Sequence, residues 1–343
     1  MLRILPSKIP ALLATIVSCS LGLGSMGQAH SQEKTSPQTV EIIVPWGAGG
    51  GADRLAQETG KLLQSALSMS AKITSIPGRT GNAGMEKLIT SPNDGQLLSV
   101  LTAETYCLLA YANPGWKPSS ITPLAIMMKQ PSAFFLPTTG RFKNWTDFEK
   151  EARQKPNTLR VAISGLGSPD YLMLQQLYLK GIQLRPVPFE NPEQRYQAVL
   201  NGQADALYEQ PADVMALTES GQLQTVLFFA PARVAGYKDV PVSSELGLSN
   251  GIPQFRAIIL KAGTDPQKLQ SLAQAFEKIA AMSDYKVFLK QQRATDDSFV
   301  SAKNAPAFLQ EQLANMKQIV QSLPFHAQYL WEGQTVEAYV EPF

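Results

Sequence analysis

The clearest chemistry in this sequence is anion binding by a loop of glycines. Gly47-Ala48-Gly49-Gly50-Gly51-Ala52, followed by Asp53, lies between a strand predicted over 40–45 and a helix predicted over 52–67. Successive backbone N–H groups ahead of a helix, with the positive end of the helix dipole behind them, attract negative charge. Glycine also lets the backbone approach a ligand closely. The loop therefore predicts a site for an anionic group, unless it is a glycine-rich turn that binds nothing.

The same loop fits the G-x-G-x-x-A pattern of dinucleotide-binding proteins, but its surroundings argue against a nucleotide. That fingerprint requires an acidic residue about 20 positions further on, which binds the ribose. Here no Asp or Glu lies between Glu58 and Glu86. A phosphate-binding P-loop requires a lysine directly after its glycines, and none stands there. We therefore expect no cofactor, and a small anion remains as the ligand of this loop.

A second loop of the same kind follows a strand predicted over 159–163. It reads Ser164-Gly165-Leu166-Gly167-Ser168 and precedes a helix predicted over 170–179, so it offers two hydroxyl groups as well as backbone N–H groups. If the two loops face one another across a cleft, they can grip a molecule that bears a carboxylate. The alternative is that they are two unrelated turns.

Residues that would support catalysis are scarce. The chain has two histidines, His30 and His326, and no Cys/His spacing typical of a metal site. Ser164 is not in a G-x-S-x-G motif and has no general base near it in the sequence. Asp205 and Glu209 would share one face of a strand and could do acid–base work, although solvated or salt-paired carboxylates are commoner. We expect no catalytic residue and no metal, with a hydrolase or an isomerase as the alternative.

The elements that hold these loops alternate between strands and helices, which predicts an α/β fold with mainly parallel sheets. Strands are predicted over 40–45, 71–76, 97–102, 124–128, 133–137, 159–163, 184–188, 204–208, 223–230 and 254–261. Helices are predicted over 52–67, 82–90, 145–154, 170–179, 192–201, 212–220, 266–282 and 305–322. With 343 residues, 44% of them hydrophobic and 17% charged, the chain is long enough for two domains.

Residues 1–29 are predicted to be a signal peptide. Arg3 and Lys8 precede an apolar segment, and Gly27-Gln28-Ala29 is a small-x-small cleavage site, so we expect an exported protein. Ile16-Val17-Ser18-Cys19 resembles a lipoprotein cleavage box, which makes lipid anchoring at Cys19 an alternative. A helix that stays in the fold is a further alternative.

Charge and cysteine content limit which partners and which disulfide bonds the mature chain can have. Removing residues 1–29 takes away two basic residues, Arg3 and Lys8, from a total of 30, which leaves Lys plus Arg equal to the 28 Asp plus Glu. With neither an excess of positive charge nor a Lys/Arg cluster, we expect no nucleic-acid partner. Cys107 is then the remaining cysteine, so no intrachain disulfide can form. It follows an apolar strand, which predicts a buried thiol.

Several short motifs occur in the order typical of one family. The matches are Val44-Pro45-Trp46 through Asp53 with VPF-x-AGG-x-x-D, Pro92-Asn93-Asp94-Gly95 with PDGYTLL, the 164–168 loop with SGxGS, Gly202-Gln203-Ala204-Asp205 with GGQVD, and Ala262-Gly263-Thr264 with APAGTP. Each match is weak alone, but the ordered set is specific and extends from Val40 to Gln321. The chain resembles the substrate-binding proteins of tripartite tricarboxylate transporters, known as the Bug family.

This resemblance implies a two-domain, periplasmic-binding-protein-like (type II) α/β fold with a ligand cleft between the domains. Domain I would comprise 30–127 and 231–343, and domain II would comprise 128–230. The implied ligand-binding residues lie in the two loops and at two strand ends: Ala48, Gly49, Gly50, Gly51, Ala52, Asp53, Thr102, Ala103, Glu104, Ser164, Gly165, Leu166, Gly167, Ser168, Glu209 and Gln210.

The resemblance also implies a function without catalysis. A periplasmic, monomeric protein would capture a small carboxylate or amino acid, close around it by hinge motion and deliver it to membrane permease subunits. The alternative within the same class is a sensory protein that presents its ligand-bound form to a receptor.

The chain departs from the family pattern where it would touch the ligand. Ala52 replaces a Ser or Thr, Tyr171 replaces a His, and Tyr208-Glu209-Gln210 stands in place of Phe-Asp-Asn. If Glu209 and Gln210 point into the cleft, the pocket is smaller or the ligand carries a donor such as an ammonium. Otherwise Glu209 faces solvent or pairs with a base. Arg79 and Arg256 are candidate counter-charges.

Overall fold

The computed structural model describes residues 39–189 and 191–323, which belong to one compact unit, Pro37–Phe343. The predicted signal peptide, Cys19, His30 and His326 lie outside the described residues. None of the described helices is long and apolar enough to cross a membrane.

Two β-sheets organise the described residues, and the first has six strands in the order β11-β4-β10-β3-β1-β2. Its strands are β1 (Thr39–Val44), β2 (Ser70–Ser75), β3 (Leu97–Thr102), β4 (Ile121–Gln130), β10 (Gln254–Lys261) and β11 (Val300–Ser301). β1 pairs in parallel with β2 and β3, whereas β10 runs antiparallel to β3 and β4 and β11 runs antiparallel to β4.

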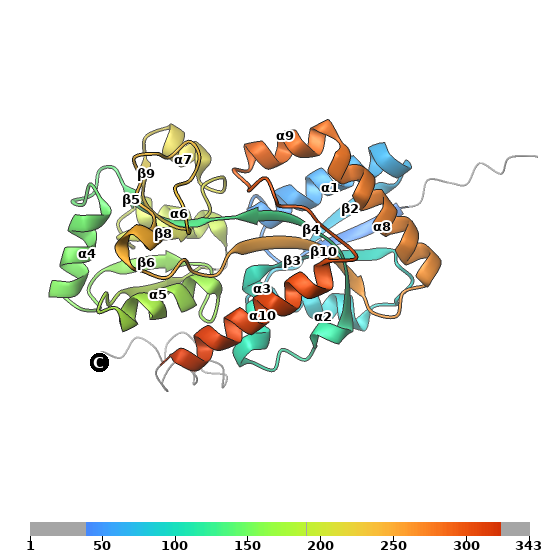
Figure 1. Cartoon of the computed structure of the whole chain (residues 1–343), viewed down its shortest axis with the longest axis horizontal. Helices are drawn as coiled ribbons and strands as arrows, with labels where there is room; N and C mark the ends of the chain where they lie inside the picture. Colours follow the sequence, from blue (N-terminus) through green and yellow to red (C-terminus); the bar gives the residue numbers. More distant parts are fainter. Residues whose placement is uncertain (1–38, 190, 324–343) are drawn as a thin grey trace, which may run out of the picture. The chain divides into compact units, whose positions relative to one another are not determined.

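The second sheet has five strands in the order β7-β6-β8-β5-β9. They are β5 (Ser132–Pro137), β6 (Arg160–Ile163), β7 (Arg185–Pro188), β8 (Ala206–Glu209) and β9 (Leu223–Phe229). β6 pairs in parallel with β7 and β8, and β5 runs antiparallel to β8 and β9. Pro131 alone separates β4 from β5, and β10 lies beside β4, so two neighbouring strands of the first sheet carry the chain to and from the second (Figure 1).

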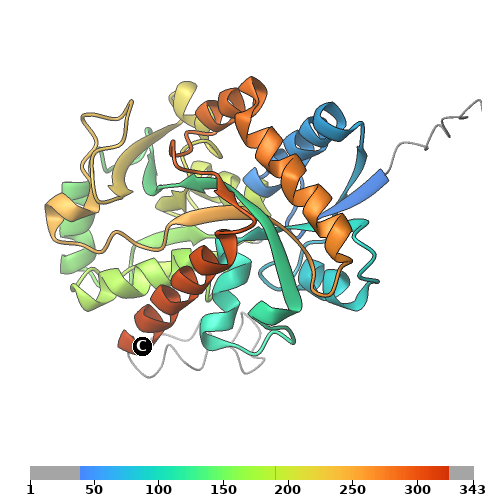
Figure 2. The ribbon, with the colours of Figure 1, turned by 45° about the vertical axis from the view of Figure 1, so that its right-hand side comes forward.

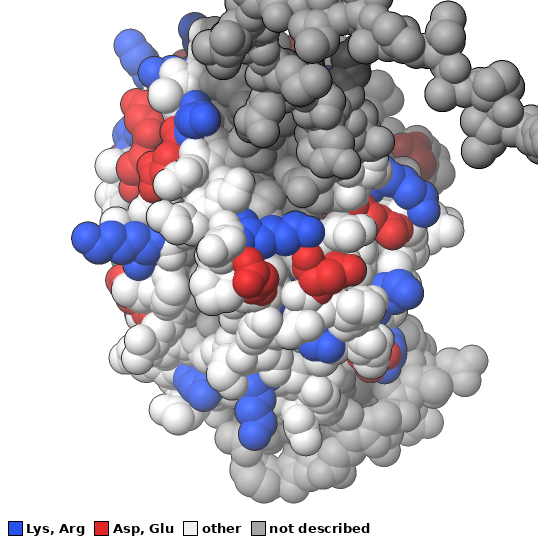
Figure 3. All heavy atoms as spheres, turned by 90° about the vertical axis from the view of Figure 1, so that its right-hand side faces the viewer, with Lys and Arg blue, Asp and Glu red and all other residues white. Residues whose placement is uncertain are grey.

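Helices pack on both sheets (Figures 1 and 2). They are α1 (Gly51–Leu67), α2 (Asn82–Thr90), α3 (Ala103–Tyr111), α4 (Trp145–Gln154), α5 (Pro169–Leu179), α6 (Pro192–Leu200), α7 (Met215–Glu219), α8 (Pro266–Ala281), α9 (Ser283–Gln291) and α10 (Ala305–Ser322), with the 3₁₀ turns η1 (Pro118–Ser120) and η2 (Ser243–Leu246). Figure 3 shows one face of the molecule, on which the basic and acidic side chains of the described residues are interspersed.

Strand β1 shows why the first sheet has helices on both faces. Ile42 and Val44 lie in one apolar cluster with residues of α1, α8 and α9, whereas Ile43 packs with residues of α2, α3 and α10. Successive side chains of a strand point to opposite faces, so an apolar run of this kind requires two covering layers. Cys107 of α3 is buried in the second of these layers, as predicted.

The second sheet follows the same rule. Phe134 of β5 packs against Phe148 of α4 and shares a cluster with Leu172 of α5, whereas its neighbour Phe135 lies in another cluster with Val199 of α6. The cluster that holds Phe134 also holds Ile43 of the first sheet. A continuous apolar core therefore supports both sheets on one side.

The predicted α/β alternation is confirmed, but the prediction of mainly parallel sheets is wrong. Both sheets are mixed, because β10 and β5 run antiparallel to their neighbours. The sequence also does not predict two helices, α3 and α9, because almost no loop precedes them. Thr102 ends β3 and caps α3, and Met282 alone separates α8 from α9.

Candidate ligand-binding site

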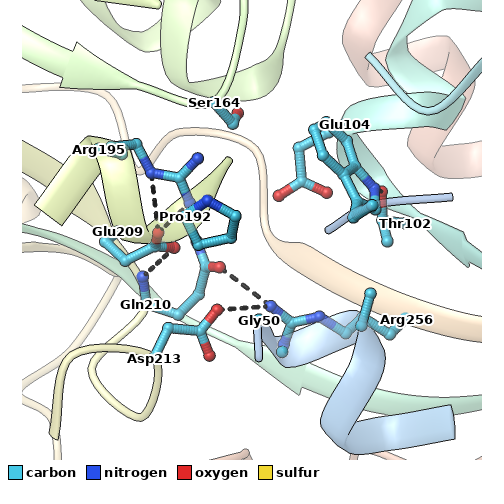
Figure 4. A pocket seen from close by; sticks show the side chains of 13 residues that line it. Gly50, Thr102, Glu104, Ser164, Pro192, Arg195, Glu209, Gln210, Asp213 and Arg256 are labelled. Carbon is cyan, nitrogen blue, oxygen red and sulfur yellow. Dashed lines mark hydrogen bonds and ion pairs between the residues drawn. The ribbon is translucent and has the colours of Figure 1, made fainter. Parts of the chain in front are cut away.

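Strand ends from both sheets meet around one pocket. The chain that leaves the C-terminal ends of β1, β3, β6, β7 and β8 contributes to its lining, in keeping with the rule that open α/β sheets bind ligands beyond these ends. The lining consists of Trp46, Gly50, Gly51, Ala52, Thr102, Glu104, Ser164, Pro192, Arg195, Glu209, Gln210, Asp213 and Arg256. Its free volume is about 40 Å³, and charged side chains surround it (Figure 4).

The first glycine loop opens toward this pocket. Gly50 is the N-cap of α1, and no side chain caps the first turn, so the positive end of the helix dipole lies in the pocket wall. A Cβ atom on Gly51 would overlap the guanidinium of Arg256, so glycine allows this cation to lie against the helix end. Asp53 instead accepts a hydrogen bond of 3.0 Å from the Gly49 N–H on the exposed side of the loop.

Glu104 is positioned by the junction of β3 and α3. Thr102 caps α3, accepting a 3.3 Å hydrogen bond from the Thr105 N–H and one of 3.1 Å from Trp46 Nε1. Glu104 thus lies in the first helical turn, where the dipole favours an acidic side chain. Its carboxylate points into the pocket (Figure 4). Burial raises the pKa of Glu104, although the charge of Arg256 and a hydrogen bond with Thr102 oppose that rise.

The second glycine loop is closed on itself. Ser168 caps α5 through its Oγ, which accepts from a backbone N–H three residues on and donates to the Gly165 carbonyl at 2.7 Å. Gly167 has a φ of 77°, and a Cβ atom there would overlap the Tyr111 side chain. Of the five residues in this loop, Ser164 lines the pocket.

Asp170, in the first turn of α5, holds Ser164 in place. Its Oδ2 accepts hydrogen bonds from the Ser164 N–H at 2.8 Å and from the Ser164 hydroxyl at 2.7 Å. Burial, together with the charges of Glu104 and Glu209, raises the pKa of Asp170 to about 7. The serine hydroxyl therefore donates to a buried carboxyl group, and no described histidine lies beside it.

Glu209, at the end of β8, is paired from α6. Arg195 Nε donates to its Oε2 at 3.2 Å, Arg195 Nη2 donates to the same atom, and the Tyr196 hydroxyl lies 3.2 Å from it. The Gln210 N–H donates to Oε1 at 3.0 Å. Glu209 therefore both lines the pocket and pairs with a base, which combines the two alternatives that the sequence left open.

Asp213 connects the second-sheet side of the pocket to the first. Its carboxylate forms ion pairs with Arg54 of α1 and with Arg256 of β10, the latter at 3.0 Å. Arg256 Nη2 also donates to Gln210 Oε1 at 3.2 Å, and Arg256 Nη1 donates to Gln130. A network of charged groups thus joins α1 and β10 to the chain that follows β8.

Half of the predicted binding residues line the pocket: Gly50, Gly51, Ala52, Thr102, Glu104, Ser164, Glu209 and Gln210. The others lie outside its lining: Ala48, Gly49, Asp53, Ala103, Gly165, Leu166, Gly167 and Ser168. Ala48 and Gly49 are exposed, whereas Ala103, Gly167 and Ser168 are buried. Contact of any predicted residue with a ligand stays a prediction.

Sequence analysis missed Trp46, Pro192, Arg195 and Asp213 as lining residues. Arg195 and Asp213 each lie a few residues beyond the C-terminal end of a parallel strand, β7 and β8 respectively, and that position is the signal that could have found them. Of the two candidate counter-charges, Arg256 lines the pocket, whereas Arg79 is exposed and pairs with Glu86.

Among the described residues, the arrangement around the pocket offers groups suited to binding. Within residues 39–189 and 191–323, no three His, Cys, Asp or Glu side chains are grouped so that they could hold a metal ion. Asp205, the candidate acid–base partner of Glu209, pairs with Arg160 at 3.0 Å instead. Paired charges, an uncapped helix end and buried hydroxyl groups are suited to holding a charged solute.

Fold and site together define a binding protein whose pocket lies between the strand ends of two sheets. A family profile described as "Tripartite tricarboxylate transporter family receptor" matches residues 55–325. A Cupriavidus necator protein named "UPF0065 protein in gbd 5'region" is 24% identical over 314 residues, which cover 89% of this chain and 94% of that protein.

Solved structures show the same fold. The periplasmic binding protein BugD aligns with a TM-score of 0.75 at 18% identity, covering 83% of this chain and 97% of that one. MatC (Rpa3494) from Rhodopseudomonas palustris, solved with bound malate, aligns with a TM-score of 0.75 at 22% identity, covering 82% of this chain and 99% of that one.

The chain belongs to the tripartite tricarboxylate transporter receptor family, because the family profile matches most of its length. The resemblance to the Bug proteins and the periplasmic-binding-protein-like α/β fold are thereby confirmed. Members of this family are solute-binding receptors, so the chain is a solute-binding protein and not an enzyme, as predicted.

Proposed function

We propose that this protein captures a small organic carboxylate in the pocket at the strand ends. The observation that carries the proposal is the position of Arg256, whose guanidinium lies against the uncapped N-terminus of α1. A guanidinium and a helix N-terminus each attract an anion, and together they form a site for a carboxylate. Ser164 lies in the same pocket, and its hydroxyl oxygen, which donates its proton to Asp170, can accept a hydrogen bond there. Malate, bound by the similar MatC, is a small carboxylate of this kind.

Ligand entry requires the pocket to open, because its free volume of about 40 Å³ holds only a few water molecules. The two sheets are proposed to belong to two domains, 30–127 with 231–343 and 128–230, which move about the strands that join them. The ion pairs of Asp213 with Arg54 and Arg256 then connect the domains in the closed form. A ligand that binds the closed form more tightly shifts the population toward it.

The proposed setting is the periplasm. The mature protein, freed of residues 1–29 or anchored through Cys19, acts there as a monomer. Its closed, loaded form docks on membrane permease subunits and hands over the acid.

The test is ligand binding by the chain from His30 onward, with Arg256→Gln as the pocket variant and Arg79→Gln as the matched control. Thermal unfolding is followed against mono-, di- and tricarboxylates and amino acids. A ligand present at about 100 times its dissociation constant adds about 2.7 kcal/mol to the free energy of unfolding. We expect a responder for the wild type and for Arg79→Gln, and a much weaker response for Arg256→Gln. No response from wild-type protein that is free of bound solute would contradict the proposal.

A further inference from the structure

Most of the charges around the pocket are compensated within the protein. Arg195 pairs with Glu209, and both are buried. Asp213 pairs with two guanidinium groups at once, those of Arg54 and Arg256, so this trio keeps one net positive charge. That positive charge lies at the α1 side of the pocket, where the carboxylate of the ligand is proposed to bind.

Among the acidic residues that line the pocket, Glu104 is the exception. It is 9% exposed, its carboxylate points into the pocket (Figure 4), and it forms no ion pair within 4.0 Å with any described residue. The cation whose charge acts on it is Arg256, but that guanidinium already donates to Gln130, Gln210 and Asp213. A buried carboxylate without a counter-charge is unfavourable. Burial raises the pKa of Glu104, and the charge of Arg256 only partly opposes that rise.

We propose that the ligand carries a protonated amino group that donates hydrogen bonds to the Glu104 carboxylate, while its own carboxylate binds beside the Arg256 guanidinium at the N-terminus of α1. The inference rests on the proposed function, because it adds a second contact for the same ligand. The class of ligand is then a zwitterionic amino acid and not a plain mono- or dicarboxylate.

The balance of charge favours a zwitterion over a dicarboxylate. The lining has three acidic residues, Glu104, Glu209 and Asp213, and two basic ones, Arg195 and Arg256, so a dicarboxylate would add two negative charges to a lining without an excess of positive charge. A zwitterion adds no net charge, and each of its ends meets a group of opposite sign. Charge-assisted hydrogen bonds of this kind are shorter and stronger than neutral ones.

The experiment compares acids that differ only by the amino group. Binding to the wild-type chain from His30, freed of bound solute, is measured by calorimetry for propionate and alanine, succinate and aspartate, glutarate and glutamate, and 3-phenylpropionate and phenylalanine. In the pairs that bind, we expect the amino-bearing acid to bind about 10-fold or more tightly, since a hydrogen bond to a charged group has that effect. Glu104→Gln should abolish this preference, and the matched control Glu86→Gln, at an exposed ion pair, should keep it.

The outcomes separate the two proposals. Preference for the acids without an amino group would overturn the inference and leave carboxylate capture standing; it would point to a protonated Glu104 that donates to the ligand. A preference for amino acids that survives in a folded Glu104→Gln protein would overturn the assignment to this residue. Failure of every acid to bind the wild type would overturn the proposed function, and the inference with it.

Discussion

The two glycine loops share a strand–loop–helix context but differ in how the helix begins. In the first loop, glycines alone stand at the start of α1, and Gly50, Gly51 and Ala52 line the pocket beside a guanidinium. In the second, Ser168 caps α5 with its own side chain, and the loop glycines pack against other parts of the protein. The first loop therefore keeps its helix end available to an anion, whereas the second uses its donors internally.

A glycine pattern therefore marks where a backbone must bend or approach another group closely, but not which group it approaches. Gly51 makes room for Arg256, which is part of the pocket, whereas Gly167 makes room for the side chain of Tyr111 in α3. The residue at the N-cap decides whether the helix end is available to an anion, because a Ser there satisfies a helix N–H that a glycine leaves without a partner.

The substitution from which we expect the greatest loss of stability, Arg256→Gln, lies in the charge network beside the first loop. Arg256→Gln leaves the buried carboxylate of Asp213 with one of its two cations, and breaking a buried pair costs about 3 to 5 kcal/mol. We expect a loss of this order in the free energy of unfolding, measured with urea. Arg79→Gln, at an exposed pair, should change it by less than about 1 kcal/mol. Equal effects of the two substitutions would contradict the network.

The next effect concerns the second loop and depends on pH. Asp170 has a pKa of about 7 in the folded protein and 3.8 as the ordinary value, so the folded state binds more protons between these limits. The contribution of Asp170 to the free energy of unfolding therefore falls as the pH rises from 4 to 7. Asp170→Asn keeps an acceptor for Ser164 without this titration, and its stability relative to the wild type should rise by about 2 to 3 kcal/mol between pH 5 and pH 8. A difference that stays constant with pH would exclude this role.

A matched pair of glycine substitutions compares the loops directly. Gly51→Ala displaces the Arg256 guanidinium, so ligand affinity should fall about 10- to 100-fold, the effect of losing one charge-assisted contact. Residue 167 has a positive φ, and a Cβ atom there would overlap the Tyr111 side chain. Gly167→Ala should therefore lower the free energy of unfolding by at least about 1 to 2 kcal/mol, while the folded fraction of the protein still binds the ligand. Calorimetry on protein of measured folded fraction checks both. The reverse pattern would show that the second loop is the one that holds the ligand.

The smallest effect tests the cap itself. Ser168→Ala removes the side-chain acceptor at the start of α5, which typically costs about 1 kcal/mol. Urea unfolding should show this loss, and ligand affinity should change little because Ser168 does not line the pocket. A large loss of affinity at unchanged stability would argue for direct contact.

Much of the fold could be predicted because Gly, Pro and polar clusters mark the ends of most elements. The helix over 145–154 and the strand over 254–261 are predicted with the limits that the structure shows. The missed helices begin where a single residue ends one element and opens the next. The direction of β5 and β10 could not be predicted either, because pairing partners far apart in sequence decide it.

The site is harder to predict, because its properties depend on ion pairs between residues that lie far apart in the sequence. The sequence predicts both Glu104 and Glu209 as binding residues, and it singles out Glu209 as the one that would meet a donor such as an ammonium. The structure separates them, since Glu209 lies against Arg195 whereas Glu104 forms no ion pair with any described residue. Likewise, Asp213 gains its role from Arg54 and Arg256, which lie 159 residues before it and 43 residues after it. No local pattern encodes such pairings.

The carboxylate of the ligand is proposed to bind at the N-terminus of α1 and not at that of α5. Glycine-selective ¹⁵N labelling with titration of the best-binding acid distinguishes the two helix ends, because each loop then reports through the amides of its own glycines. We expect large shifts at Gly50 and Gly51 and small ones at Gly165 and Gly167, with assignments made by single Gly→Ala substitutions. Large shifts confined to Gly165 and Gly167 would show that the carboxylate binds at the N-terminus of α5 instead.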